Sequence, residues 1–310
     1  MTSAPIRTFA ELLDSARRCN KPRMAVAAAG ESAVIASVAH AMKEGLIAPV
    51  LVGDAAHIQE IAARQCVDLH QAEIINISNP VEASAMAVRL VHEGQADLVM
   101  KGLVTTKEFA RAILNQEFGM RWGRPLSHVA IIESPDQSRL MLLTDSGINI
   151  RPRFNRKIAI VRNALSVANA LGIAVPKVAV IAAVETVELP AMPATLDAEL
   201  LRRMGDSGKF GPCVIDGPLS MDNALDSQAA EIKSRRSPVA GHADIIVAPD
   251  IETANAIYKT IRHLARREIA SVVIGAAAPA VVASRSDSAL SKLYSIALGV
   301  LTSQGIPVRL

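Results

Sequence analysis

Short apolar runs alternate with longer stretches of helical periodicity along most of this 310-residue chain. A short amphipathic helix is predicted first, because Thr8 and Glu11 have the spacing of a capping box, and the apolar run RMAVAAAG at 23–30 follows it. Further apolar runs predict strands near residues 48–52, 72–77, 96–101, 178–184, 213–216, 244–248 and 271–275. Because a helical stretch follows each run, the pattern predicts βα units and a mostly parallel sheet.

Residues 126–150 interrupt this alternation. Two apolar runs flank the sequence SPDQS with no room for a helix, which predicts an antiparallel hairpin. A helix from about 154 to 171, ended by Gly172, is expected next. Since 310 residues exceed the usual size of one hydrophobic core, we expect two tightly joined α/β domains with a ligand site in the crevice between them.

Composition narrows the function classes. Half of the residues are hydrophobic but only 3% are aromatic, so small aliphatic side chains must build the core. A net charge of +3 gives no electrostatic case for binding nucleic acid or a membrane. The first 21 residues contain no apolar signal region and no long apolar run follows, so we expect a cytoplasmic protein. The three scattered cysteines predict neither disulfides nor a zinc site.

Polar residues follow several of the predicted strands, where open α/β sheets bind ligands. After Pro249 come Asp250, Glu252 and Asn255, which either contact a ligand or only start the next helix. After the run ending at Lys101, Thr105 and Glu108 form a second capping box. Thr106 and Arg111 add a hydroxyl and a cation there, so the segment is either a phosphate site or an ordinary helix start.

A third candidate lies near the end of the chain. Ser284 and Arg285 follow a predicted strand, and Ser286 with Asp287 is expected to open a helix. A guanidinium beside hydroxyl groups suits a phosphate or an acyl phosphate, although a capped helix with an exposed arginine has the same sequence. His128, inside a predicted strand, is either an interior histidine or a polar contact. The chain has no GxGxxG, P-loop or HExxH motif.

Seven blocks of the sequence, in order, support a resemblance to a known family. They are KGLVTTKEFARAIL, LSHVAIIE, LLTDSGINIRP, AMPATLDAELL, DGPLSMDNA, SPVAGHADIIVAPDIETANAIYK and SRSDSALSKLYSIAL. The chain resembles the phosphate acetyl/butyryltransferases, most closely the phosphate butyryltransferase branch.

This resemblance implies a two-domain α/β fold like that of isocitrate and isopropylmalate dehydrogenases, with an interdomain cleft and a homodimer. The expected domains are residues 1–148 with 285–310, and residues 149–284. The implied reaction converts acyl-CoA and phosphate into acyl phosphate and CoA, in the acetyl to butyryl range. Neither a metal, a cofactor nor a covalent enzyme intermediate is implied, and CoA is a substrate.

The family motifs also imply roles for individual residues. Ser284 and Arg285 match a pair that holds the phosphoryl group, and with Asp287 they form the predicted catalytic set. The "PD…N…YK" block supplies Asp250, Asn255 and Lys259, and the "D…IN" block supplies Asp145 and Asn149. The full set expected to bind substrate or CoA is Lys101, Thr105, Thr106, Arg111, Ser127, His128, Asp145, Asn149, Asp250, Asn255 and Lys259.

The sequence departs from the family at one position. The acetyltransferase branch has an Asp about six residues past the arginine, which takes the CoA thiol proton, whereas this chain has Ala289, Leu290 and Ser291 in that region. Asp287 is the nearest substitute. If no group substitutes, the chain is instead a non-catalytic protein that binds CoA or acyl phosphate. A metal-dependent decarboxylating dehydrogenase of the same fold is a further alternative, but no converging set of carboxylates for magnesium is evident.

Overall fold

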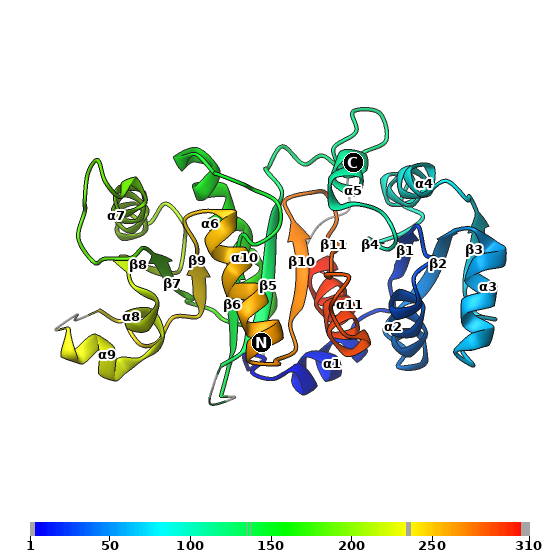
Figure 1. Cartoon of the computed structure of the whole chain (residues 1–310), viewed down its shortest axis with the longest axis horizontal. Coiled ribbons are helices and arrows are strands. Elements are labelled where there is room, and N and C mark those ends of the chain that lie inside the picture. The colour runs from blue at the N-terminus through cyan, green and yellow to red at the C-terminus, as the bar shows by residue number, and fades with distance from the viewer. Residues whose placement is uncertain (1–3, 135, 137, 234–236, 305–310) are drawn as a thin grey trace. The chain divides into compact units, whose positions relative to one another are not determined.

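The computed structural model describes residues 4–134, 136, 138–233 and 237–304 (Figure 1). Its contacts divide the chain into two compact units, each discontinuous in sequence. Unit 1 contains Pro125–Arg267 with the segment ending at Thr8, and unit 2 contains Phe9–Arg124 with the segment from Glu268 onward. The expected layout also joined the C-terminal segment to the first domain, but it placed the boundaries after residues 148 and 284.

The sheet of unit 2 has the strand order β3-β2-β1-β4-β11-β10. The pairs β1–β2, β2–β3, β1–β4 and β4–β11 are parallel, and β10 runs antiparallel to β11. The bounds of these strands are β1 Arg23–Ala27, β2 Ala48–Gly53, β3 Glu73–Asn76, β4 Leu98–Lys101, β10 Ala270–Ile274 and β11 Ala280–Val281. The sheet therefore combines strands from both ends of the chain.

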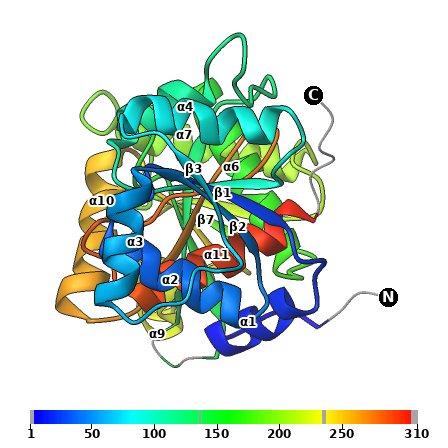
Figure 2. The same cartoon turned by 90° about the vertical axis from the view of Figure 1, so that its right-hand side faces the viewer.

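Helices cover both faces of this sheet. On one face α4 contacts β1, β2 and β4, with α5 beside it, and on the other α11 contacts β10, α1 and α2 (Figure 2). Close packing requires a glycine in α11, because a Cβ on Gly299 would lie 2.6 Å from Val281 Cγ2. The helices are α1 Phe9–Arg17, α2 Ser32–Lys43, α3 Ala55–Arg64, α4 Pro80–His92, α5 Thr106–Ile113 and α11 Ala289–Ser303.

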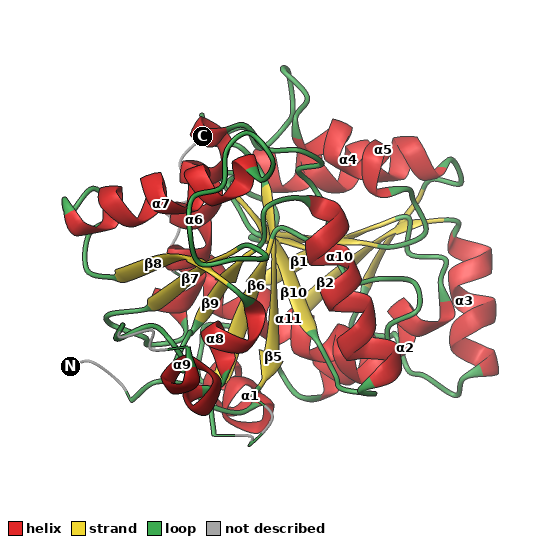
Figure 3. Cartoon of the chain, turned by 60° about the vertical axis from the view of Figure 1, so that its left-hand side comes forward, coloured by secondary structure: helices red, strands yellow, loops and turns green. Residues whose placement is uncertain are grey.

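Unit 1 contains a second mostly parallel arrangement, in the order β5-β6-β9-β7-β8. β5 and β6 form an antiparallel hairpin, and β6–β9, β9–β7 and β7–β8 are parallel. Helix α7 lies against β7 and β8, while α8 lies on the opposite face of these strands (Figure 3). The strands are β5 Ser127–Glu133, β6 Leu140–Thr144, β7 Lys177–Ile181, β8 Val214–Leu219 and β9 Ile245–Val247.

The helices of unit 1 are α6 Phe154–Ala170, α7 Pro193–Asp206, α8 Met221–Leu225, α9 Ser227–Ile232 and α10 Ile251–Lys259, which continues into the π-helical turn η1 Thr260–Leu264. The predicted hairpin and the helix from 154 are confirmed. Gly172 follows α6 with φ +81°, a left-handed conformation that glycine adopts readily.

The α/β class and the predicted strands are confirmed, but the predicted start of the last helix is wrong. Ser286 and Asp287 precede α11, whose N-cap is Ser288, with its hydroxyl accepting from the Ser291 N–H at 3.0 Å. Ser286 and Asp287 belong instead to the turn that precedes this helix. Within the described ranges, no helix combines the length and apolarity that crossing a membrane requires.

Candidate functional site

The carboxyl ends of three parallel strands meet at one edge of the unit 2 sheet. Strands β1, β4 and β11 are neighbours, so the loops that follow them lie side by side. The first two loops touch, since Gly102 N–H donates to Ala27 O at 2.8 Å and a Cβ on Gly102 would lie 2.4 Å from Ala28 O. We call the polar residues brought to this edge the strand-end cluster: Glu31, Lys101, Ser284, Arg285, Asp287 and Lys292.

Lys101 is the buried cation at the end of β4. Its side chain donates to Gly102 O and Val104 O, both at 3.1 Å, and the residue is 7% exposed. Burial lowers the pKa of Lys101; the carboxylate of Glu31 opposes this, and the charges of Arg285 and Lys292 lower the pKa further. Predicted residues from two distant segments, Lys101 and Arg285, are thus electrostatic neighbours.

Lys292, on α11, was not identified in the sequence. It is 2% exposed, and its Nζ donates to Ser284 O at 3.0 Å and Asp287 O at 2.9 Å. The same Nζ lies 3.7 Å from Glu31 Oε1. A buried ammonium group requires such partners. These contacts therefore connect the turn that contains Arg285 with Glu31, the residue that precedes α2. The sequence did contain a signal for this residue, because Lys292 occupies one of the buried, mostly apolar positions of α11.

The turn from Ser284 to Asp287 presents Arg285 outward. Asp287 is 4% exposed, and its Oδ2 accepts from the Ser284 N–H at 2.7 Å. The Ser284 and Ser286 hydroxyl oxygens are 3.0 Å apart, and Arg285 is exposed. Asp287 therefore closes the turn, while the arginine that follows β11 is accessible to an anion.

The first turn of α5 contains the other predicted phosphate contacts. The capping box is confirmed: Thr105 Oγ1 accepts from Glu108 N–H at 3.2 Å and donates to Glu108 Oε2 at 2.6 Å. The hydroxyl and the N–H of Thr105 both donate to Glu108 Oε2, at 2.6 and 3.2 Å, and together with the charge of Arg111 they lower the pKa of Glu108. Thr105 thus contributes its hydroxyl to the helix cap, whereas the side chains of Thr106 and Arg111 are exposed.

A second group of predicted residues converges in unit 1, after β6 and along α10. Asp145 accepts from the Gly147 and Ile148 N–H groups at 3.0 and 2.9 Å, and from Asn149 Nδ2 at 2.5 Å. We call this group the Asp145 cluster: His128, Asp145, Ser146, Asn149 and Asn255. Since Asp145 is 4% exposed and holds its own loop, its observed contacts are structural.

Ser146 links the remaining members of the Asp145 cluster. His128 Nδ1 is 2.9 Å from Ser146 Oγ, and Asn255 Nδ2 donates to Ser146 O at 3.1 Å. The ring of Tyr258 packs edge-on to His128 with centroids 6.0 Å apart. His128 is 6% exposed, so it lies in the interior. An interior histidine was one of the two interpretations of its sequence position, the other being a polar contact with a ligand.

Other predicted residues of unit 1 lie outside this cluster. Ser127 is fully buried and accepts from Asn163 Nδ2 of α6 at 2.8 Å. Asp250 caps α10, accepting from the Thr253 N–H at 2.8 Å and from its hydroxyl at 2.7 Å. Lys259 lies at the end of that helix, with Nζ 5.4 Å from the Tyr258 ring centroid. The strand-end cluster and the Asp145 cluster belong to different units.

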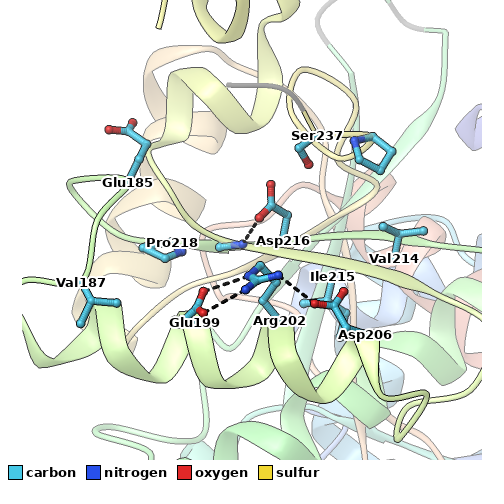
Figure 4. Close-up of a pocket in the computed structure, with 12 residues that line it drawn as sticks. Glu185, Val187, Glu199, Arg202, Asp206, Val214, Ile215, Asp216, Pro218 and Ser237 are labelled. Atoms are coloured by element: carbon cyan, nitrogen blue, oxygen red, sulfur yellow. Dashed lines mark hydrogen bonds and ion pairs between the residues drawn. The ribbon is translucent and has the colours of Figure 1, made fainter. Parts of the chain in front are cut away.

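A pocket of about 520 Å³ lies elsewhere in unit 1, between α7 and β8 (Figure 4). None of the predicted site residues lines it. Its described lining includes Glu185, Glu199, Asp206 and Asp216, and Arg202 is held by two of these carboxylates, Glu199 at 2.9 Å and Asp206 at 2.8 Å. Among the described lining residues, carboxylates outnumber cations, an arrangement that does not favour a phosphate ligand.

Among the described residues, no three His, Cys, Asp or Glu side chains are grouped closely enough to hold a metal ion.

A family profile described as "Phosphate acetyl/butaryl transferase" matches residues 78–300. The chain belongs to this family. It is 43% identical to a phosphate butyryltransferase from Clostridium acetobutylicum over 96% of this chain and 99% of that protein. It is 38% identical to a phosphate acetyltransferase from Thermotoga maritima over 94% of this chain and 99% of the relative.

The fold of the chain is also similar to that of a solved phosphotransacylase. A branched-chain phosphotransacylase from Enterococcus faecalis V583 superposes with a TM-score of 0.79, at 28% identity, over 91% of this chain and 98% of that one. The resemblance stated from the sequence motifs is therefore confirmed, and so is the prediction of an acyltransferase enzyme at the level of the family.

Proposed function

We propose that this chain transfers an acyl group between CoA and inorganic phosphate, as the names of its relatives indicate for those proteins. We assign the site from one observation. The exposed Arg285 lies on a turn whose carbonyl groups accept hydrogen bonds from Lys292, and its charge acts on the buried Lys101. Cations at the carboxyl edge of a parallel sheet form an arrangement suited to the phosphoryl group of an acyl phosphate.

In the direction that forms the thioester, the sulfur of CoA attacks the acyl carbonyl carbon. The bond from that carbon to the phosphate oxygen then breaks, and phosphate leaves. Arg285 can bind two phosphoryl oxygens at once and stabilise the charge that collects on them. Ser284, beside it, can donate its hydroxyl to a third oxygen. Direct attack needs no covalent enzyme intermediate, as the resemblance predicts.

CoA release measures this activity directly. The purified protein is incubated with acetyl-, propionyl- or butyryl-CoA, with and without inorganic phosphate, and the thiol is followed with a chromogenic reagent. We expect phosphate-dependent release, and the three rates rank the acyl chains. If no acyl-CoA releases CoA in a phosphate-dependent way, the proposed activity is wrong.

Arg285→Ala tests the assignment of the site. The substitution is expected to lower the rate by at least about 10², because it removes the group that stabilises charge in the transition state. Arg64→Ala is the matched control, since Arg64 is exposed on α3 and forms a surface ion pair with Glu60. If the folded Arg285→Ala variant has the same rate as wild type, Arg285 is not part of the catalytic site.

A non-catalytic protein that binds CoA or acyl phosphate is the second candidate. The first turn of α11 contains no acidic residue, which leaves the proton of the CoA thiol without an acceptor on that helix. This candidate predicts CoA binding in calorimetry without turnover in the release assay. The dehydrogenase-like cleft, the homodimer and the cytoplasmic location stay predictions from the sequence.

A further inference from the structure

The proposed reaction needs a group that accepts the proton of the CoA thiol. A free thiol with a pKa of about 8.5 is only a few per cent thiolate at neutral pH, and the thiolate is the nucleophile. A positioned base typically raises such a rate by about 10²–10⁴. The structure therefore has to supply a carboxylate or another base within reach of Arg285.

A carboxylate from another element contacts the first turn of α11. Glu268, two residues before the start of β10, accepts from the hydroxyl groups of Ser288 and Ser291, each at 2.5 Å. The Ser291 hydroxyl oxygen also accepts from the Ile269 N–H at 3.0 Å. These bonds fix the segment before β10 against the helix, so that Glu268 lies at the turn where α11 has no acidic residue of its own.

The register of β10 and β11 places Glu268 at the same edge as Arg285. Val272 pairs with Val281, and Ser271 Oγ donates to Val282 O at 2.7 Å, one step further along. Because the strands are antiparallel, moving back from Ser271 toward Glu268 corresponds to moving forward from Val282 toward Arg285. The carboxylate and the guanidinium therefore stand at the same end of this strand pair.

The two carboxylates of the strand-end cluster, Asp287 and Glu31, contact buried groups of the cluster itself. Asp287 is buried and accepts from a backbone N–H within its own turn. Glu31 lies 3.7 Å from the buried Lys292 ammonium. Glu268 is half-buried, and its carboxylate is oriented by the hydroxyl groups of Ser288 and Ser291.

We propose that Glu268 is the proton acceptor for the CoA thiol in this enzyme. This inference rests on the proposed function. As the S–H bond breaks, the proton passes to the Glu268 carboxylate while the sulfur forms its bond to the acyl carbon. The carbon–oxygen bond to phosphate then breaks, its electron pair stays on the phosphate oxygen, and Glu268 returns the proton to that phosphate. The net change moves one proton from thiol to phosphate.

The test compares wild type with Glu268→Gln in thioester formation from acetyl phosphate and CoA, followed by absorbance between pH 7 and 9. Glutamine retains an oxygen that can accept from Ser288 and Ser291 but accepts no proton. We expect the rate at pH 7 to fall at least about 10²-fold. Because the variant depends on thiolate already present, its deficit is expected to shrink as pH rises toward the thiol pKa.

Other charged groups lie close to Glu268, so the ratio of the two enzymes is the quantity to follow. Those next to it in the chain or in the strand-end cluster are Arg266 and Arg267 before β10, Arg285 and Asp287 on the turn, and Lys292 on α11. They are present in both proteins, so the ratio isolates the effect of the Glu268 side chain. A merely structural role for Glu268 predicts the same deficit at every pH and a lower melting temperature.

Glu82→Gln is the matched control, since Glu82 occupies the first turn of α4 and is exposed; its rate is expected to equal that of wild type. A pH-independent deficit, or no deficit, in Glu268→Gln overturns the assignment of Glu268. Failure of the wild type to form thioester overturns the proposed function instead, so the two failures are distinguishable.

Discussion

At the scale of single residues, buried charges determine the shape of the turn that carries Arg285. Lys292 and Asp287 are both nearly inaccessible, and each satisfies backbone groups of this turn. An unpaired charge in the interior is strongly unfavourable, so each contact restricts the turn to a conformation that retains these partners. The exposed arginine thus stands on a rigid support, which favours binding of a small anion.

Lys292→Met tests this support. The substitution leaves Ser284 O, Asp287 O and the Glu31 carboxylate without the ammonium group, and we expect the free energy of unfolding to fall by roughly 3 kcal/mol. The KM for phosphate is expected to rise more than kcat falls, because binding depends on the position of Arg285. Urea denaturation and steady-state kinetics measure the two effects. Lys292→Arg, which retains the charge, should recover part of both.

Local contacts could be predicted from the sequence and distant ones could not. The pairing of Thr105 with Glu108 and the cap at Asp250 depend on residues three positions apart, and both are confirmed. The contacts of Lys292 with Glu31 and of Glu268 with Ser291 join segments that only the fold brings together. No local pattern contains that information.

At the scale of elements, side-chain caps determine where helices begin. Ser288, not Ser286 or Asp287, caps α11, because the preceding residues form a turn closed by the Asp287 carboxylate. Serine and aspartate favour both turns and caps, so the sequence SRSDS allows several helix starts. The strands could be predicted more accurately, since their apolar runs are bounded by polar residues and glycine.

Asp250→Ala is expected to destabilise α10. Its carboxylate accepts two hydrogen bonds from Thr253, and loss of an N-cap typically costs about 1 kcal/mol. Asp250→Asn retains the acceptor oxygen, so its stability in urea should match wild type. Equal stability of the alanine variant and wild type would contradict the capping role. A higher KM for CoA in the asparagine variant, whose cap is intact, would reveal a separate contact with substrate.

Helix α7 provides a pH-dependent contribution to stability. Hydrogen bonds from Arg202 and Arg203 lower the pKa of Glu199 to about 2, below its ordinary value of 4.5. A depressed carboxyl pKa stabilises the folded state above the ordinary value, and this contribution disappears as pH falls toward the folded one. Glu199→Gln should therefore lower the melting temperature at pH 7, with a smaller difference from wild type below about pH 4.5. A difference that stays constant down to pH 3 would contradict this mechanism.

At the scale of the whole molecule, the α/β class could be predicted, whereas the expected domain boundaries stay a prediction. The expected first domain, residues 1–148 with 285–310, includes the hairpin β5–β6. In the structure β6 pairs with β9, a strand from much later in the chain, so the contacts assign the hairpin to Pro125–Arg267. Such pairing depends on which strands meet, which their individual sequences do not specify.

Ligand binding should raise the stability of the whole protein. A ligand at 100 times its Kd stabilises the native state by about 2.7 kcal/mol, so acetyl phosphate or inorganic phosphate should raise the melting temperature by several degrees. The rise is expected to be lost in Arg285→Ala and retained in Arg64→Ala. An equal rise in all three proteins would show that phosphate acts at another place.

The position of β11 between β4 and β10 has a consequence for the growing polypeptide on the ribosome. Strands β1 to β4 are synthesised first, but one edge of β4 has no partner until β11 emerges, after the whole of Pro125–Arg267. At typical elongation rates this interval lasts on the order of 10 s. During it the nascent sheet presents an open strand to which other chains can add. Ribosomes that stall before codon 280 should therefore release chains that aggregate, although most of the polypeptide has already been made.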